Sequence, residues 1–282
     1  MEYLFLYWEL FADSFLAGCF VAWLLAQVGV LVVARDQIFL GAAVSQASTL
    51  GIAIALAIGA AVGEESWVHS AHFSTGTAVI FSVIAAFVTS RVGQQESYEA
   101  VTGWVFLVAG SLAILIVADS PHGQEEVHNL LFSSIVVAQR TDVWIFSVLA
   151  VVTTTVVFLC RDRLLLFTID PAMATAVGMR MSIWSFVSAV WLGVSVGLAI
   201  SSSGLLFTFG CLVLAPLVAK NVLRELRPML LVAPVVAVVA TAASFVMADR
   251  FGYPPGQLTV VALGLLVVLA WTLGWWRRSR RD

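Results

Sequence analysis

The sequence predicts an all-α, polytopic membrane bundle, and three observations support that prediction. Hydrophobic residues make up 61% of the 282 residues and charged residues only 11%, whereas soluble domains carry roughly 25% charged residues. The mean hydropathy is +1.01. Apolar runs of about 20 residues, the length that crosses a bilayer as a helix, recur along the whole chain. The small net charge of −3 gives no reason to expect a nucleic-acid partner.

The apolar runs predict eight or nine transmembrane helices within one transmembrane domain that covers residues 1–282. The two shortest runs, 76–91 and 204–218, decide between the two counts. The run from Leu130 to Ala138 is too short to cross, so we expect a re-entrant or interfacial segment there. In chain order the predicted spans are 10–33, 42–62, 76–91, 100–118, 142–160, 182–200, 204–218, 229–249 and 257–276.

The basic residues predict the orientation of the chain. Cytoplasmic loops of membrane proteins are enriched in Lys and Arg, and the segment 277–281 after the last span holds four arginines. With nine spans and this end inside, every other Lys and Arg also falls on the cytoplasmic side, except Arg140 and Arg250. We therefore expect a cytoplasmic C-terminus and an N-terminus on the opposite side.

The same topology places all four histidines in loops on the outer side. His122 and His128 flank Glu125 and Glu126, and imidazole with carboxylate ligands suits borderline divalent cations. These four residues are a candidate site for outer capture of a metal ion. The alternative is an ordinary solvated loop that contains histidine.

Catalytic and nucleotide-binding motifs are absent from the sequence. The only lysine, Lys220, follows Ala219 and precedes Asn221, so the chain has no Gly-Lys-Ser/Thr phosphate-binding loop. It has no His-Glu-x-x-His and no Gly-x-Ser-x-Gly motif. Carboxylates are rare in the span centres, which disfavours a proton relay. We expect that the chain is not an enzyme and binds no cofactor of its own.

Residues 161–180 are expected to form the longest cytoplasmic loop, with a short helix inside it. Asp170 suits an N-cap, and Pro171 suits the first helical position. Gly178 suits the residue that stops the helix. Such a helix at the inner membrane face is either an interfacial connector or a docking helix for a cytoplasmic partner.

A small, polar notch opens the second span. It holds Ser45, Gln46 and Ser48, with Ala42 one turn before Gln46. Polar residues inside a membrane usually face a bundle interior or a pathway, so the notch is a candidate part of a translocation pathway. The alternative for Gln46 is a hydrogen bond between helices. Further along the chain we expect packing glycines at positions 193, 197 and 204.

Four motifs in register resemble the metal-ion ABC permeases, the membrane subunits of zinc, manganese and iron importers. The motifs cover most of residues 35–220. They are Asp170-Pro171-x-x-Ala174-x-x-x-Gly178; Phe39-x-Gly41-x-Ala43-x-Ser45-x-Ala47; the stretch from His128 to Ile135 with Asp142; and the run from Gly204-Leu205-Leu206 to Leu214-Ala215-Pro216.

The resemblance implies the permease subunit of an ATP-driven importer for a divalent metal ion in the bacterial cytoplasmic (inner) membrane. Two permease subunits, identical or related, would form the pore, surrounded by membrane lipid. A periplasmic or lipid-anchored binding protein would deliver the metal. Separate ABC ATPase subunits would hold the ATP, and their closure would rock the coupling helices and switch access. The residues implied in ATPase coupling are Asp170, Pro171, Ala174, Gly178 and Met179.

The notch departs from the family pattern at two positions. The family typically has an Asp after the glycine and a His before the last small residue, and both are regarded as metal contacts. The matching residues here are Ala42 and Gln46, which share a helix face but offer no charged or imidazole ligand. Three explanations stay open: a heterodimer whose partner subunit carries the ligands, metal passage by weak contacts with outer capture, or a different solute.

Two functions from other classes remain as alternatives. An intramembrane enzyme would need a compact polar cluster within one leaflet, whereas the His and Glu residues of this chain fall in loops. A scaffold that binds another membrane protein would not need a defined helix at the inner face.

Overall fold

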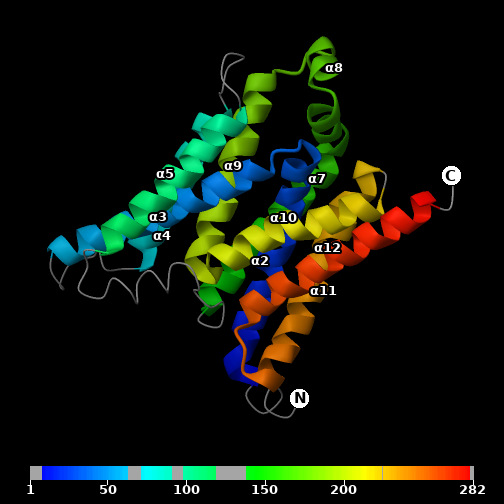
Figure 1. The fold of residues 1–282 in the computed structure, drawn as a ribbon. Helices are drawn as coiled ribbons and strands as arrows, with labels where there is room; N and C mark the ends of the chain where they lie inside the picture. Colours follow the sequence, from blue (N-terminus) through cyan, green and yellow to red (C-terminus); the bar gives the residue numbers. More distant parts are fainter. Residues whose placement is uncertain (1–7, 63–70, 91–97, 119–137, 224, 280–282) are drawn as a thin grey trace. The chain divides into compact units, whose positions relative to one another are not determined.

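The computed structural model describes residues 8–62, 71–90, 98–118, 138–223 and 225–279. Every regular element in these ranges is a helix (Figure 1). In chain order the helices are α2 (Trp8–Ala34), α3 (Ile38–Val62), α4 (Ala71–Ser90), α5 (Tyr98–Ala118), α7 (Arg140–Ile169), α8 (Pro171–Ala176), α9 (Met181–Ser203), α10 (Leu205–Val222), α11 (Leu226–Phe251) and α12 (Pro255–Ser279).

The predicted membrane bundle is confirmed. Within the described ranges, nine helices are long and apolar enough to cross a membrane. The two shortest predicted runs are among them, as His72–Ser90 and Leu205–Val222. The predicted segment from Leu130 to Ala138 lies outside the described residues except for Ala138.

The predicted loop at 161–180 is wrong for its first half, because α7 continues as a helix to Ile169. Arg161-Asp162-Arg163 does not end the helix, since these residues are compatible with it and are followed by apolar side chains. Leu164, Phe167 and Thr168 are buried, so tertiary packing supports the extension. The helix ends at Asp170, whose φ of −137° is extended, because the ring of Pro171 disfavours a helical residue before it.

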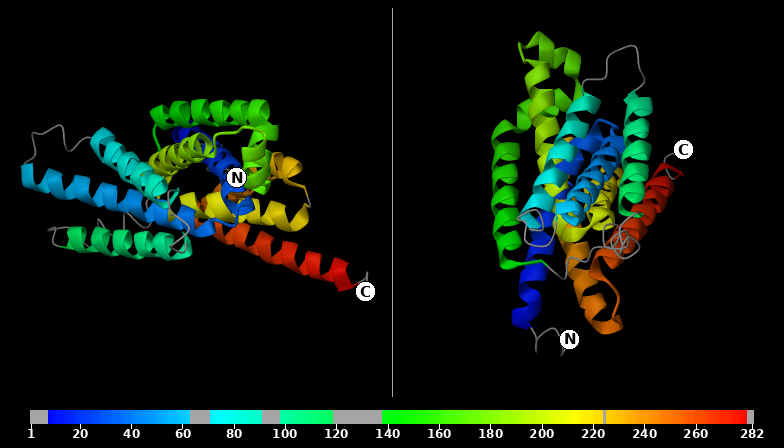
Figure 2. Two further views of the ribbon diagram at one scale, coloured as in Figure 1. Left: turned by 90° about the horizontal axis from the view of Figure 1, so that it is seen from above. Right: turned by 90° about the vertical axis from the view of Figure 1, so that its left-hand side faces the viewer.

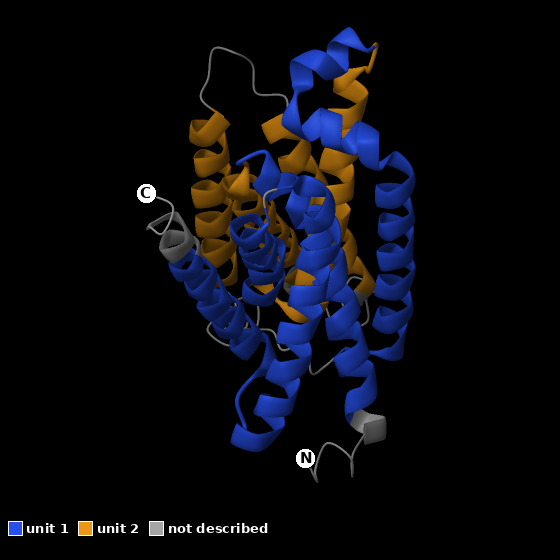
Figure 3. Cartoon of the chain, turned by 90° about the vertical axis from the view of Figure 1, so that its right-hand side faces the viewer, with its two compact units in different colours: residues 1–36, 134–177, 206–282 blue, residues 37–133, 178–205 orange. Residues whose placement is uncertain are grey.

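The contacts divide the chain into two compact units, each assembled from separate stretches of sequence (Figure 3). Unit 1 comprises residues 1–36, 134–177 and 206–282, and therefore holds α2, α7, α8, α11, α12 and almost all of α10. Unit 2 comprises residues 37–133 and 178–205, and holds α3, α4, α5 and α9.

In unit 2, α3 lies between α4 and α5, and α9 packs on α4 (Figure 2). Gly193 and Gly197 of α9 meet the backbone of α4, where an added Cβ would come within 2.6 Å of Val83 Cα and 2.7 Å of Val79 Cα. The hydroxyl of Ser82 donates to the carbonyl of Gly193 at 2.6 Å. The predicted packing role of these two glycines is confirmed.

Gly204 has a conformational role at the end of α9, and its predicted packing role stays a prediction. It caps α9 with φ 78° and ψ 169°, a conformation that is essentially restricted to glycine. One residue later α10 begins. Glycine is needed at position 204 for its backbone angles.

In unit 1, α2 packs on α7 and α11, and α12 packs on α11. The backbones of α2 and α10 approach closely at Gly29, where a Cβ would meet the Leu212 carbonyl oxygen at 1.8 Å. Phe15 of α2 makes an edge-on ring contact with Phe245 of α11, with the centroids 5.6 Å apart.

Polar contacts hold the ends of α2, α7 and α10 together in unit 1. The Lys220 ammonium binds the Asp36 carboxylate at 2.6 Å and the Val33 carbonyl, at the C-terminus of α2, at 3.2 Å. A cation at this position also suits the dipole of α2. The Arg35 guanidinium lies 4.4 Å from the ring centre of Phe167, near the end of α7. These contacts hold the end of α7, which leads into α8, beside the ends of α2 and α10.

Candidate functional site: the α8 region and the α3 notch

The short helix α8 has the local structure that the sequence predicts. The Asp170 carboxylate accepts a hydrogen bond from the Met173 backbone N–H at 2.8 Å, Pro171 occupies the first turn, and Gly178 follows with φ 82°. Ala174 is buried on the inner side of the helix. The helix therefore presents Met173 and Val177 outward, with 58% and 64% of their surfaces exposed. Met179 is half-buried.

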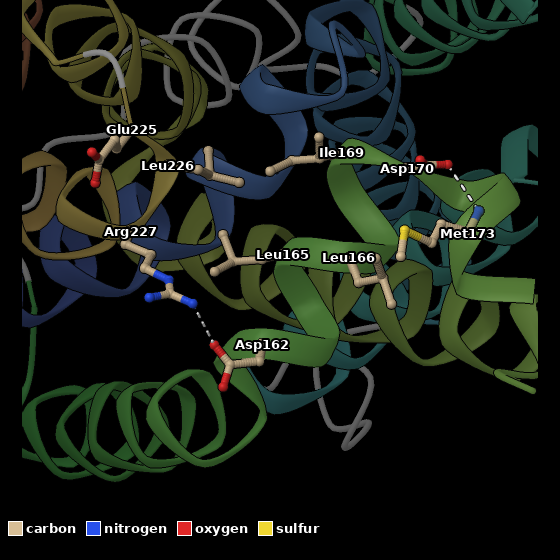
Figure 4. A pocket seen from close by; sticks show the side chains of 9 residues that line it. All are labelled: Asp162, Leu165, Leu166, Ile169, Asp170, Met173, Glu225, Leu226 and Arg227. Carbon is tan, nitrogen blue, oxygen red and sulfur yellow. Dashed lines mark hydrogen bonds and ion pairs between the residues drawn. The ribbon is translucent and has the colours of Figure 1, made fainter. Parts of the chain in front are cut away.

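Beside α8, unit 1 has an open pocket of about 640 Å³, which we call the α8 pocket (Figure 4). The C-terminal turns of α7, the start of α8 and the start of α11 form its walls. The Arg227 guanidinium binds the Asp162 carboxylate across it at 3.1 Å. The lining residues are Asp162, Leu165, Leu166, Ile169, Asp170, Met173, Glu225, Leu226 and Arg227.

The contribution of α11 to this pocket was not predicted from the sequence. Arg224-Glu225-Leu226-Arg227 interrupts two apolar runs with three charged residues, a signal that we assigned only to membrane orientation. The position of Arg227 next to Asp162 depends on the packing of α7 and α11, which are distant in sequence. The pocket holds apolar side chains, the Arg227–Asp162 ion pair and two further carboxylates, an arrangement that suits binding of another surface.

The notch residues lie on two faces of α3 in unit 2. Ser45 and Ser48 are buried, at 1% and 0% exposure, and their hydroxyls have no hydrogen-bond partner in the part of the chain that the structure describes. Ala42 and Gln46 share another, half-buried face. The Gln46 amide lies against α5, where a Cβ at Gly110 would come within 2.9 Å of Gln46 Oε1.

A polar cluster inside unit 1 was also missed. Trp23 Nε1 donates a hydrogen bond to the Thr154 hydroxyl at 3.0 Å. The Thr154 hydroxyl in turn donates to Gln27 Oε1 at 2.9 Å. Gln27 is completely buried, and its Nε2 has no partner among the described residues. A lone amide in the long apolar stretch of α2 was the available signal.

The described residues contain no group of three or more His, Cys, Asp or Glu side chains that could hold a metal ion. The predicted outer capture residues, His122, Glu125, Glu126 and His128, lie outside the described ranges. Their role therefore stays a prediction.

The chain is similar to several membrane transport proteins along most of its length. It is 24% identical over 245 residues to the manganese transport system membrane protein MntC of Halalkalibacterium halodurans, covering 86% of this chain and 80% of that protein. It is 21% identical over 248 residues to the manganese import system permease protein ScaB of Streptococcus gordonii, covering 86% and 84%. The match covers at least 80% of the length of each of these two relatives.

The fold is also similar to that of a solved structure, PsaBC from Streptococcus pneumoniae in complex with Fab. The TM-score is 0.75 at 17% sequence identity, and the match covers 92% of this chain and 90% of the other. In addition, the model of the ABC 3 transport family matches residues 7–274. The chain therefore belongs to the ABC 3 transport family, which confirms the resemblance of its motifs to metal-ion ABC permeases.

Proposed function

We propose that this chain is the permease subunit of an ATP-driven importer for a divalent metal ion, with manganese the first ion to test. The capped helix α8 is the observation that carries the proposal. Its N-cap, first-turn proline and left-handed Gly178 fix a short helix with two exposed apolar side chains at the end of α7. Family membership and relatives named as manganese transport proteins support the choice of ion.

The coupling step uses α8 as the docking element for an ABC ATPase subunit. Ala174 anchors the inner side of the helix, while Met173 and Val177 face outward. Asp170, Pro171 and Gly178 set the ends of the helix, and Met179 follows it. ATP is bound and hydrolysed in the partner subunit, because this sequence has no phosphate-binding loop.

The remaining parts of the assembly follow from the same proposal. The chain acts as one transmembrane permease domain in the bacterial inner membrane, with α8 and the C-terminus in the cytoplasm. The pore forms from two permease subunits. A periplasmic or lipid-anchored protein delivers the metal on the outer side, near the histidine-containing loops.

The notch does not supply strong ligands for the ion. Ala42 has no donor atom, and Gln46 offers only an amide oxygen that already packs against Gly110. The buried hydroxyls of Ser45 and Ser48 are weak ligands for a divalent cation. We propose that the strong ligands come from a related second permease subunit in a heterodimer, with outer capture by His122, Glu125, Glu126 and His128 as the competing explanation.

Uptake of radiolabelled manganese into proteoliposomes tests the proposal. Liposomes with this chain, its ATPase and a related second permease, with the metal-delivering binding protein outside, should take up the ion only when ATP is inside with the ATPase. Omitting the second permease should abolish uptake. ATP-dependent uptake by this chain and the ATPase alone would contradict the heterodimer, and no uptake of manganese, zinc or iron by any combination would contradict the metal function.

The competing explanation has its own variant. Replacing His122, Glu125, Glu126 and His128 together by Ala should leave heterodimer uptake unchanged at saturating metal. A large loss of uptake in this variant would favour outer capture over ligands from the second subunit.

A further inference from the structure

We infer that the α8 pocket receives a protruding element of the ATPase subunit that carries an apolar side chain beside an Arg or Lys. The inference rests on the proposed coupling function, and it adds the start of α11 to the docking surface. Its basis is the combination of an apolar floor, an acidic rim and continuity with the exposed face of α8 (Figure 4).

The floor of the pocket calls for an apolar occupant. Leu165 and Leu166 of α7 and Leu226 of α11 are half-buried there. Ile169 and Met173 leave 69% and 58% of their surfaces exposed beside them. A volume of about 640 Å³ lies in the range of roughly 300–1,000 Å³ typical of ligand pockets. It has room for more than one side chain.

The rim determines the charge of the occupant. Among the described residues, three carboxylates and one guanidinium line the pocket. Asp162 is paired with Arg227 at 3.1 Å and with Arg161 at 3.7 Å, and Asp170 accepts the Met173 N–H. Glu225 is exposed and makes no side-chain capping bond to α11. The excess negative charge favours a cationic group close to Glu225, and Arg is the cation most enriched at the centre of protein interfaces.

The ATPase is the occupant that best fits the position. Met173 belongs both to this pocket and to the exposed face of α8, so a partner docked on α8 reaches the pocket without a second binding event. The acidic rim disfavours anionic lipid headgroups. The chain's own segment 277–281 is positively charged, so it is the competing occupant that the cross-linking experiment distinguishes.

Photo-cross-linking of the complete transporter in nanodiscs tests the occupant. A Glu225→Cys variant carries a benzophenone maleimide, in a background with Cys19→Ala and Cys160→Ala that keeps the buried Cys211. The matched control is Val239→Cys, on the same helix and 62% exposed. Position 225 should cross-link to the ATPase, and position 239 should not. A cross-link from position 225 only to lipid or to segment 277–281 overturns the inference.

Affinity measurements test the charge of the occupant. Glu225→Lys should weaken ATPase binding about fivefold or more and Glu225→Gln by less, since contacts to a charged group dominate such effects. Arg250→Glu reverses a charge at the other end of α11 and should leave binding unchanged. Size-exclusion profiles identify any variant that fails to fold.

A substitution at Val177, the C-cap of α8, which does not line the pocket, separates this inference from the proposed function. Val177→Asp should abolish ATPase binding if α8 is the docking helix. Loss of binding in Val177→Asp with normal binding in Glu225→Lys overturns the pocket inference alone. Normal binding in both variants overturns the coupling function itself.

Discussion

A single hydrogen bond sets the start of α8. Asp170 ends α7 with a non-helical backbone (φ −137°, ψ 84°) and caps the next helix by accepting the Met173 N–H at 2.8 Å. An Asp side chain suits the capping position, because it offers an oxygen to an otherwise unpaired N–H group of the first turn. The cap could be predicted from the sequence because every residue involved lies within four positions.

Replacing this cap should weaken α8 and its docking. Asp170→Ala removes the acceptor and should cost about 1 kcal/mol of local helix stability, with a lower affinity for the ATPase. Asp170→Asn keeps a capping oxygen and should behave nearly like the natural chain. Calorimetric titration of the ATPase into nanodisc-bound permease measures the difference. Equal affinities for the Ala and natural chains would contradict the role of the cap.

Gln27 is a residue whose environment only the fold reveals. Its Oε1 pairs with Thr154, 127 residues away, while Nε2 has no partner among the described residues. A buried polar group without a partner costs about 1–3 kcal/mol. We therefore expect the amide to lower the stability of the α2–α7 contact.

Two variants should change stability in opposite directions. Gln27→Leu removes the unpaired group and should raise stability by about 1 kcal/mol, since Thr154 keeps its bond to the Ala150 carbonyl. Thr154→Val leaves both Trp23 Nε1 and Gln27 Oε1 without this partner and should lower stability. Thermal unfolding in detergent gives both values. A decrease in both variants would show that Gln27 has a further partner.

At the scale of elements, close backbone approach determines which helices pair. Gly193 and Gly197 form a smooth stripe on α9 that meets the backbone of α4, the small-residue packing typical of membrane helices. The i, i+4 spacing of these glycines is visible in the sequence. Their partner helix is not, because many apolar spans could accept a glycine stripe.

Adding one methyl group at this contact should destabilise unit 2. Gly197→Ala would place a Cβ 2.7 Å from Val79 Cα, and overpacking of this kind costs about 1–3 kcal/mol. Gly103→Ala is the matched control, since a Cβ there meets nothing within 4 Å. Temperature-dependent loss of the monodisperse fraction should separate the two variants. Similar curves would mean that α4 and α9 can move apart without cost.

The extent of α7 shows where element prediction fails. Charged residues at 161–163 suggested the end of a span, and the helix continues to Ile169. Apolarity measures where a helix leaves the membrane, whereas helix ends are determined by backbone conformation. Pro171 explains the end at Ile169, because its ring disfavours a helical conformation of Asp170 before it.

At the scale of the whole molecule, the nine candidate spans of the described ranges predict termini on opposite sides of the membrane. A green fluorescent protein fused after Asp282 should therefore fluoresce in the cytoplasm, where it folds. The same protein fused before Met1 should stay dark, and alkaline phosphatase at that position should be active. Fluorescence from both the N-terminal and the C-terminal fusion would contradict an odd number of spans.

The sequence by itself determined the membrane class, the expected orientation and the local structure of α8, and it limited the number of spans to eight or nine. These properties depend on composition, on run length and on residues a few positions apart. The tertiary structure decided which surfaces meet: Arg227 at Asp162, Gln46 against Gly110, and Thr154 at Gln27. Uniformly apolar spans carry little information about their neighbours, because lipid and another helix are equally apolar. Shape and a few polar groups therefore choose the partners, and these act only after the helices have come together.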